Sequence, residues 1–200
     1  MELYYSPTSP YARKARAVII EKGLEASVKT TAVIPYENPP KLLRANPLCK
    51  VPALVLENGD ALFDSPVICA YLDGQGEGPK LIPDDQDRLW PVMKQQALAD
   101  GMLDATYLTV METKRDPSQR SKDWTDRLQD AIIRTLDIAE TDYSLPSQNP
   151  DLGQLTLAIA LEYLDLRMDE LNWRQGRAKL TAWHEQLTNR ESLLKTRPQE

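Results

Sequence analysis

The 200-residue chain contains little cysteine, histidine or phenylalanine: two, one and one residues, respectively. Two cysteines, Cys49 and Cys69, are too few for the disulfide framework of a secreted protein, so we expect a reducing, cytoplasmic compartment. A lone histidine, His184, cannot anchor a multi-histidine site, and we expect no bound metal. No apolar run approaches the ~20 residues that cross a bilayer, and no signal peptide is visible. We therefore expect no membrane association.

Basic residues are also outnumbered by acidic ones. The chain has 24 lysines and arginines against 30 aspartates and glutamates, which gives a net charge of −6. This balance argues against broad electrostatic attraction to nucleic acid or to anionic membranes, although a local basic pocket stays possible. The apolar and charged fractions, 42% and 27%, are ordinary for a globular protein. The length allows one large domain or two small ones.

The first part of the chain mixes strand and helix signals. Ser9 followed by Pro10 predicts a helix with a serine N-cap and proline at its first position, and Gly23 predicts its end. The other expected elements are strands at 2–5, 27–31, 53–56 and 61–63, a loop at 35–47 with at most one short helix around 41–45, and a helix capped by Ser65. The pair Asn58-Gly59 predicts a hairpin between the last two strands. This order predicts a small mixed sheet.

The second part of the chain shows only helical periodicity. Three of the eight glycines and two prolines fall within 74–83, which indicates a linker. Amphipathic stretches then predict helices at about 87–115, 119–143, 151–168 and 177–189. Pro91 is expected to kink the first of these or to place its start later. The pattern predicts an α/β domain at 1–78 and an all-helical domain at 84–200.

Five segments resemble those of bacterial glutathione transferases, in that family's order and spacing. They are Tyr4–Lys14, Asn46–Leu54, Phe63–Ile68, Ala97–Ala105 and Glu162–Arg167. The second is similar to the family segment Asn-Pro-x-Gly-Lys-Val-Pro-x-Leu. The resemblance implies a thioredoxin-like, glutathione-binding N-terminal domain and a helical bundle that supplies the electrophile pocket. It also implies a homodimer, with glutathione as cosubstrate and no further cofactor.

The activity that the resemblance implies is transfer of alkyl or aryl groups. Glutathione would bind as the thiolate and attack small apolar electrophiles, which is a detoxification reaction. Two alternatives stay open: a glutathione-binding stress or interaction protein with little catalysis, and a glutathione-dependent peroxidase. No cysteine stands near Pro10, which argues against a mixed-disulfide mechanism there.

Ser9 is the candidate catalytic residue. A free thiol has a pKa near ~8.5 and is only a few per cent ionised at neutral pH. A serine hydroxyl and the free N–H groups at a helix start would favour the thiolate. Because one oxygen would serve both capping and sulfur binding, we expect the two roles to coexist only in part. The resemblance favours Ser9, whereas Tyr5 is a rival hydroxyl donor and Tyr11 a weaker one, so the choice between Ser9 and Tyr5 stays open.

Four further residues are candidates for binding glutathione. The family has a cis peptide at the position of Val51-Pro52, which implies backbone contacts from Val51 to the cysteinyl unit. Lys50 pairs with the glycine carboxylate or is an ordinary solvated lysine. Asp64 and Ser65, at a helix start, offer a carboxylate for an ammonium, and a hydroxyl and N–H groups for a carboxylate. The γ-glutamyl end of glutathione carries both charges on one carbon.

The remaining candidates are weaker. Asp104 is a candidate for reaching the site of a partner subunit, although a solvated helix face is the default. Cys49 replaces the usual glycine of its segment and is expected to be inert, and Cys69 is expected to be buried. Asp151 with Gln154 predicts a capping box, a folding feature. Apolar residues expected in the core or in an electrophile pocket are Met102, Leu103, Tyr107, Leu108 and Met111.

Overall fold

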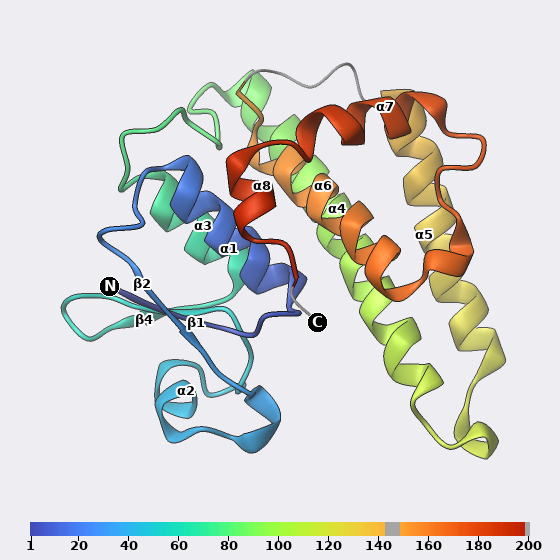
Figure 1. Ribbon diagram of the computed structural model, residues 1–200, viewed down its shortest axis with the longest axis horizontal. Helices are drawn as coiled ribbons and strands as arrows, with labels where there is room; N and C mark the ends of the chain where they lie inside the picture. Colours follow the sequence, from blue (N-terminus) through green and yellow to red (C-terminus); the bar gives the residue numbers. More distant parts are fainter. Residues whose placement is uncertain (143–148, 199–200) are drawn as a thin grey trace. The chain divides into compact units, whose positions relative to one another are not determined.

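The computed structural model describes residues 1–142 and 149–198, which form two compact units (Figure 1). The N-terminal unit comprises Met1–Asp84 together with the chain from Arg190 onward, and the helical unit comprises Asp85–Asn189. This division differs from the predicted domains at the C-terminal end, because the last helix packs against the first one rather than within the helical bundle.

The N-terminal unit contains a mixed sheet in the order β2-β1-β3-β4. Its strands are β1 (Glu2–Tyr5), β2 (Lys29–Ala32), β3 (Ala53–Val55) and β4 (Ala61–Leu62). β1 pairs with β2 in parallel, whereas the pairs β1–β3 and β3–β4 are antiparallel, so the predicted mixed sheet and hairpin are confirmed. β2 begins two residues later than expected because the N–H groups of Ser27 and Val28 donate to the carbonyl of Leu24 in the preceding turn.

Four helices belong to the N-terminal unit. They are α1 (Pro10–Glu21), α2 (Pro40–Ala45), α3 (Ser65–Asp73) and α8 (Glu191–Lys195), with a 3-10 turn, η1, at Pro35–Glu37. Ser9 is the N-cap of α1 as predicted, and Gly23 follows the helix with a φ of +64°, a conformation that favours glycine. The predicted cap of α3 is wrong by one position: Asp64 is the N-cap residue and Ser65 already lies within the helix.

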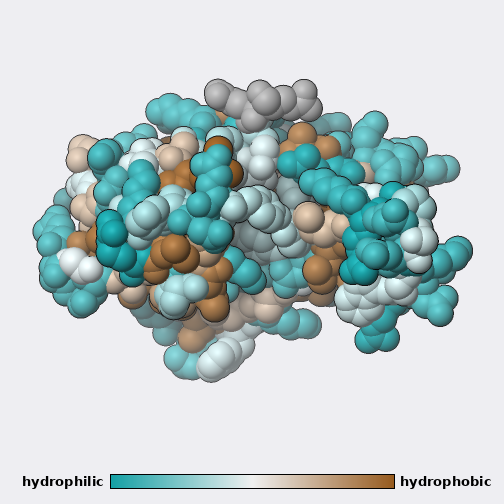
Figure 2. All heavy atoms as spheres, turned by 90° about the horizontal axis from the view of Figure 1, so that it is seen from below, coloured by the Kyte–Doolittle hydropathy of each residue, from teal (hydrophilic) through white to brown (hydrophobic). Residues whose placement is uncertain are grey.

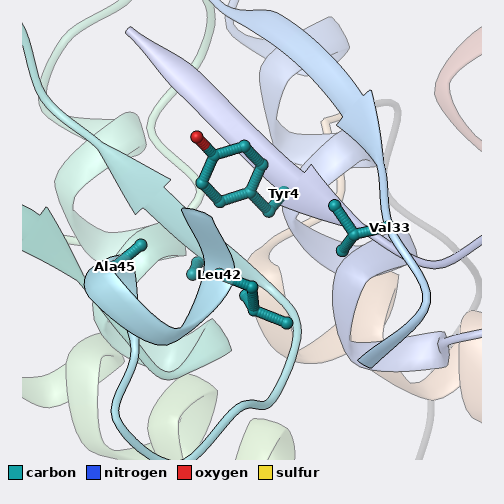
Figure 3. Packing of buried hydrophobic residues seen from close by; sticks show 5 residues of the cluster. Tyr4, Val33, Leu42 and Ala45 are labelled. Atoms are coloured by element: carbon teal, nitrogen blue, oxygen red, sulfur yellow. The ribbon is translucent and has the colours of Figure 1, made fainter. Parts of the chain in front are cut away.

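Both faces of the sheet are covered by apolar side chains. Successive residues of β1 point to opposite faces, and both Leu3 and Tyr4 are buried. On the face of Tyr4, the strands pack with α2 through a cluster that contains Tyr4, Val33, Leu42, Ala45 and Ala53 (Figure 3). Tyr4 is therefore a packing residue of the sheet.

Two glycines of the expected linker, Gly76 and Gly78, lie close to the end of α1. A Cβ atom at Gly76 would lie 2.3 Å from the carbonyl oxygen of Lys22, and one at Gly78 would lie 2.1 Å from that of Glu21. Any side chain at these two positions would displace the backbone. These glycines therefore allow two backbone segments to pack closely, and they are not part of a flexible linker.

A buried ion pair holds the same segment. The ammonium of Lys22 lies 3.1 Å from the carboxylate of Asp73, and their side chains are 1% and 3% exposed. Lys22 also donates to the carbonyls of Gly78 and Pro79, at 2.7 and 3.0 Å. The Asp73 carboxylate accepts the backbone N–H groups of the two residues at the end of the segment, Leu81 and Ile82. Residues 74–82 thus belong to the N-terminal unit.

The helical unit contains α4 (Gln86–Thr113), α5 (Lys122–Asp142), α6 (Leu152–Arg167) and α7 (Ala178–Leu187), with 3-10 turns η2 at Pro117–Gln119 and η3 at Asp169–Leu171. Pro91 lies inside α4, so a later helix start is wrong. The capping box of α6 is confirmed: Asp151 accepts the N–H of Gln154 and donates its own N–H to the Gln154 side chain. Tyr143, expected at the end of α5, lies outside the described residues. Within the described ranges, no helix has both the length and the apolar character needed to span a bilayer.

Candidate functional site

The register of the sheet brings the predicted site segments to one edge. In the antiparallel pairs, Tyr4 at the end of β1 faces Ala53 at the start of β3, and Leu54 faces Leu62 at the end of β4. The chain enters β3 from Val51, leaves β1 toward the start of α1, and leaves β4 toward the start of α3. All three segments therefore lie at the same edge of one sheet, within the N-terminal unit.

Ser9 lies at the start of α1, where its hydroxyl oxygen accepts one hydrogen bond. Its Oγ accepts a hydrogen bond from the N–H of Ala12 at 3.2 Å. A hydroxyl has two acceptor lone pairs and one donor hydrogen, so this capping bond leaves the O–H free to donate. The capping role of Ser9 is confirmed, and donation to a sulfur stays a prediction.

The backbone at the start of α1 offers fewer free N–H donors than expected. Pro10 has no N–H, the N–H of Ala12 is taken by the Ser9 side chain, and the N–H of Arg13 donates to the Ser9 carbonyl at 2.9 Å. These groups are therefore not free donors for a ligand. The Ser9 hydroxyl also lies at the N-terminal end of α1, where the helix dipole favours negative charge.

The tyrosines of β1 are in different environments. The Tyr4 hydroxyl donates to Glu2 at 3.4 Å, and burial, reinforced by the negative charge of Glu2, raises the pKa of Tyr4. Tyr5 points to the opposite face, where the guanidinium carbon of Arg16 lies 4.5 Å from its ring centroid. Arg16 is partly desolvated, and this burial lowers its pKa. Tyr4 packs in the cluster with α2 on one face of the sheet, and Tyr5 packs against Arg16 of α1 on the other face.

The start of α3 carries a carboxylate that is not used for capping. Asp64 is exposed, and its side chain makes no capping hydrogen bond although it stands at the N-cap. Ser65 is buried in the first turn, beside Pro66, which has no N–H. The N–H groups of such a first turn have no intrahelical acceptor. This helix start therefore presents one negative side chain next to backbone groups that attract an anion.

The loop between α2 and β3 ends in a cis peptide bond at Val51-Pro52, as the resemblance implied. Val51 is half-buried against the Tyr4 cluster, and Lys50 is exposed. Cys49 adopts a φ of +52°, a value that favours glycine, which fits its place at a position where the family usually has glycine. Its thiol donates to the carbonyl of Pro35 at 3.3 Å, so Cys49 has a structural contact.

Sequence reasoning missed the contribution of Asn46 to this loop. Its side chain is 2% exposed and bridges two backbone groups: the amide donates to the Lys50 carbonyl at 2.9 Å, and its oxygen accepts the Leu48 N–H at 3.0 Å. The available signal was an asparagine directly after a short helix, a residue type that bonds to nearby backbone. In the sequence analysis, Asn46 was named only as the first residue of the family-like segment Asn46–Leu54.

A second missed feature anchors α1 from the far end of the chain. Glu21 accepts hydrogen bonds from the guanidinium of Arg190, at 2.9 and 2.7 Å, and from the hydroxyl of Ser192. Burial alone would raise the pKa of Glu21, but the hydrogen bonds from Arg190 and Ser192 outweigh it and lower the pKa. Near the start of α1, the buried Arg13 donates to the carbonyl of Leu193 at 3.1 Å. The C-terminal segment therefore braces the helix that carries Ser9.

The candidates in the helical unit are placed as follows. Met102 and Leu103 are buried, Met111 is half-buried, and Asp104, Tyr107 and Leu108 are exposed. Asp165 accepts hydrogen bonds from the Trp173 indole and from both terminal nitrogens of the Arg174 guanidinium, at 2.5 to 2.8 Å, so its carboxylate has a structural role. Cys69 is buried, as expected. Among the described residues, no group of three or more His, Cys, Asp or Glu side chains could hold a metal ion.

This geometry defines a class of protein. A β-α-β unit followed by a β-β-α unit, with a cis-proline at the sheet edge beside the first helix, is a thioredoxin-like domain, here accompanied by a helical unit. A family model described as "Glutathione S-transferase, N-terminal domain" matches residues 8–75. The uncharacterised GST-like protein YibF of Escherichia coli K12 is 35% identical over 99% of this chain and 98% of its own length.

Solved structures agree with the sequence comparison. A glutathione transferase family member from Pseudomonas fluorescens Pf-5, with bound glutathione, superimposes with a TM-score of 0.91 at 37% identity, over 100% of this chain and 99% of that chain. A structure of a family member from the same organism with bound S-(propanoic acid)-glutathione gives 0.90 at 38% identity, over 100% of both chains. The chain belongs to the glutathione S-transferase family.

Proposed function

We propose that this protein is a glutathione transferase that binds glutathione as the thiolate and conjugates it to small apolar electrophiles. The observation that carries the proposal is the convergence at one sheet edge of the Ser9 hydroxyl, the Val51 backbone and the start of α3. Related structures hold glutathione and an S-substituted glutathione, which are the cosubstrate and the product type of such a reaction.

The start of α3 suits the γ-glutamyl end of the tripeptide. The Asp64 carboxylate, which makes no capping bond, would pair with the α-ammonium, and Ser65 with the first-turn N–H groups would bind the α-carboxylate. Lys50, exposed beside Val51, would pair with the glycine carboxylate at the other end. Opposite charges at the two ends of the site would fix the cysteinyl sulfur between them.

The proposed chemistry is a nucleophilic substitution by sulfur. The thiol releases its proton to solvent, and the Ser9 O–H donates to the resulting thiolate. The sulfur then forms a bond to the electrophilic carbon, and the leaving group departs with its electron pair. A thiol pKa lowered by about two units raises the thiolate share at neutral pH from a few per cent to more than half. Each unit corresponds to about 1.4 kcal/mol of preferential thiolate stabilisation.

The test is calorimetric titration with glutathione, followed by turnover of a chlorodinitrobenzene. We expect saturable binding and absorbance growth from the conjugate. Binding without turnover across a panel of electrophiles would instead support the alternative of a glutathione-binding interaction protein. Activity restricted to cumene hydroperoxide would support the peroxidase alternative. Absence of saturable glutathione binding would contradict all three.

We also propose that the protein forms a homodimer through the N-terminal unit. Apolar side chains around α2 are exposed, with Leu48 at 63%, and they include Ile34, Tyr36 and Leu43. Figure 2, seen from the side on which α2 lies, shows hydrophobic residues exposed among hydrophilic ones over this unit. Several large exposed apolar side chains in one short segment are typical of protein interfaces.

A charge placed in this surface is expected to separate the subunits. Leu48→Glu should weaken the dimer by at least about tenfold, because a carboxylate would lose its hydration in an apolar interface. The matched control is Leu194→Glu on α8, where the leucine is 44% exposed outside this surface. Light scattering over a dilution series measures both variants. A wild-type monomer at all concentrations, or equal dissociation of both variants, would contradict the proposal.

A further inference from the structure

Asn46 ties a complete loop together. Its backbone N–H donates to Leu42 at 2.7 Å and closes α2, and its carbonyl accepts the N–H of Cys49 at 2.9 Å. Its side-chain amide donates to the Lys50 carbonyl and accepts the N–H of Leu48. Asn46 therefore makes four hydrogen bonds, three of them to residues of the loop that it begins.

Side-chain packing restrains only part of this loop. Pro47, Leu48 and Lys50 are exposed, so burial of apolar surface does not fix their backbone. On either side of Lys50, Cys49 and Val51 pack against the Tyr4 cluster, and the Cys49 thiol, a weak donor, bonds to the Pro35 carbonyl. The Asn46 side chain is buried and both of its polar atoms are occupied by the loop. The amide therefore holds the carbonyl of Lys50 itself, between two residues that are anchored by packing.

We propose that Asn46 is a positioning residue for the glycine carboxylate of glutathione, acting through Lys50. The inference rests on the proposed function, since it concerns the same site. The amide fixes the carbonyl of Lys50 and thereby the direction from which the lysine side chain leaves the loop. A preordered lysine loses less conformational freedom when it meets a carboxylate, which strengthens binding.

The asparagine side chain fits this task because it is a donor and an acceptor at once. Aspartate would keep the acceptor for the Leu48 N–H but would bring a negative charge against the Lys50 carbonyl. Alanine would remove both bonds. The two substitutions thus separate loss of the whole bridge from loss of the bond to Lys50 alone.

The experiment compares two ligands, glutathione and γ-glutamylcysteine, which lacks the glycine carboxylate. For Asn46→Ala we expect an affinity for glutathione about tenfold lower, with the affinity for γ-glutamylcysteine changed less than about twofold. Asn46→Asp should show the same discrimination. At saturating glutathione, turnover should stay within about twofold of the wild type, so the loss falls on KM rather than kcat.

A double-mutant cycle with Lys50→Ala tests the route of the effect. If Asn46 acts through Lys50, Asn46→Ala should cost little further affinity in the Lys50→Ala background. Additive losses, or equal losses for both ligands, would overturn the proposal. Should Asn46→Ala fail to fold, Asn46→Asp carries the same comparison. A wild type that binds neither ligand would refute the proposed function itself, whereas a wild type that binds both with unaltered variants refutes only the role of Asn46.

Discussion

Ser9→Ala is expected to lower turnover of a glutathione conjugation by about 100-fold, the size of effect that follows loss of one preorganised donor to a developing or resident anion. The reason is that the substituted side chain has no O–H to donate to the thiolate, whereas the wild-type hydroxyl keeps its donor free while capping α1. The thiol pKa of bound glutathione should rise by about one to two units. Ultraviolet absorbance of the bound thiolate against pH measures this shift directly.

Because Ser9 also caps α1, stability has to be separated from chemistry. Ser9→Thr keeps the hydroxyl and should retain most of the activity. Ser9→Asp keeps a capping oxygen for the Ala12 N–H but has no donor when ionised, so it should fold well and still be inactive. An unshifted thiol pKa and full turnover in Ser9→Ala would contradict the assignment of Ser9 as the donor to the thiolate. If Tyr5→Phe then shows the loss, the donor is Tyr5.

Asp73→Ala is expected to lower the free energy of unfolding by about 3 to 5 kcal/mol, the range found when one partner of a buried ion pair is removed. The substitution would leave the ammonium of Lys22 in a site where its side chain is 1% exposed. It would also remove the acceptor for the N–H groups of Leu81 and Ile82. Urea denaturation monitored by circular dichroism gives the change.

A neighbouring pair provides the matched control. Lys80 and Asp84 lie 3.2 Å apart in the same part of the chain, but their side chains are 53% and 83% exposed. Asp84→Ala should therefore change stability by less than about 1 kcal/mol, as for most surface pairs. Equal effects of Asp73→Ala and Asp84→Ala would show that the buried pair does not hold residues 74–82 in place.

Much of the local structure in both units was predictable because its signals are local. Ser9 with Pro10, the turn at Asn58-Gly59, and Asp151 with Gln154 each act through hydrogen bonds to residues at most a few positions away. Such signals specify where helices and turns begin. They were less accurate where two neighbouring residues are both good caps, and at α3 the cap falls on Asp64 rather than on Ser65.

Long-range features were predicted less well. The helix α8 is only five residues long, too short to be stable by its own propensity, and it is held by Arg13 and Glu21 from a part of the chain about 170 residues away. No sequence pattern near α8 indicates that Arg13 and Glu21 are its partners. The glycines at 76 and 78 indicate only a linker, because a sequence does not show which backbone lies against them.

By itself, the sequence determined the class of fold and the residue types of the candidate site, because periodicity, capping and the family-like segments all lie within short windows of the chain. Only the tertiary structure decided how these segments meet. The register of β1, β3 and β4 gathers Ser9, Val51 and Asp64 at one edge, and contacts across the unit make Asn46 and the Lys22–Asp73 pair important. The physical reason is that strand pairing and the burial of charge join residues far apart in the chain, and their energies depend on neighbours that no local pattern contains.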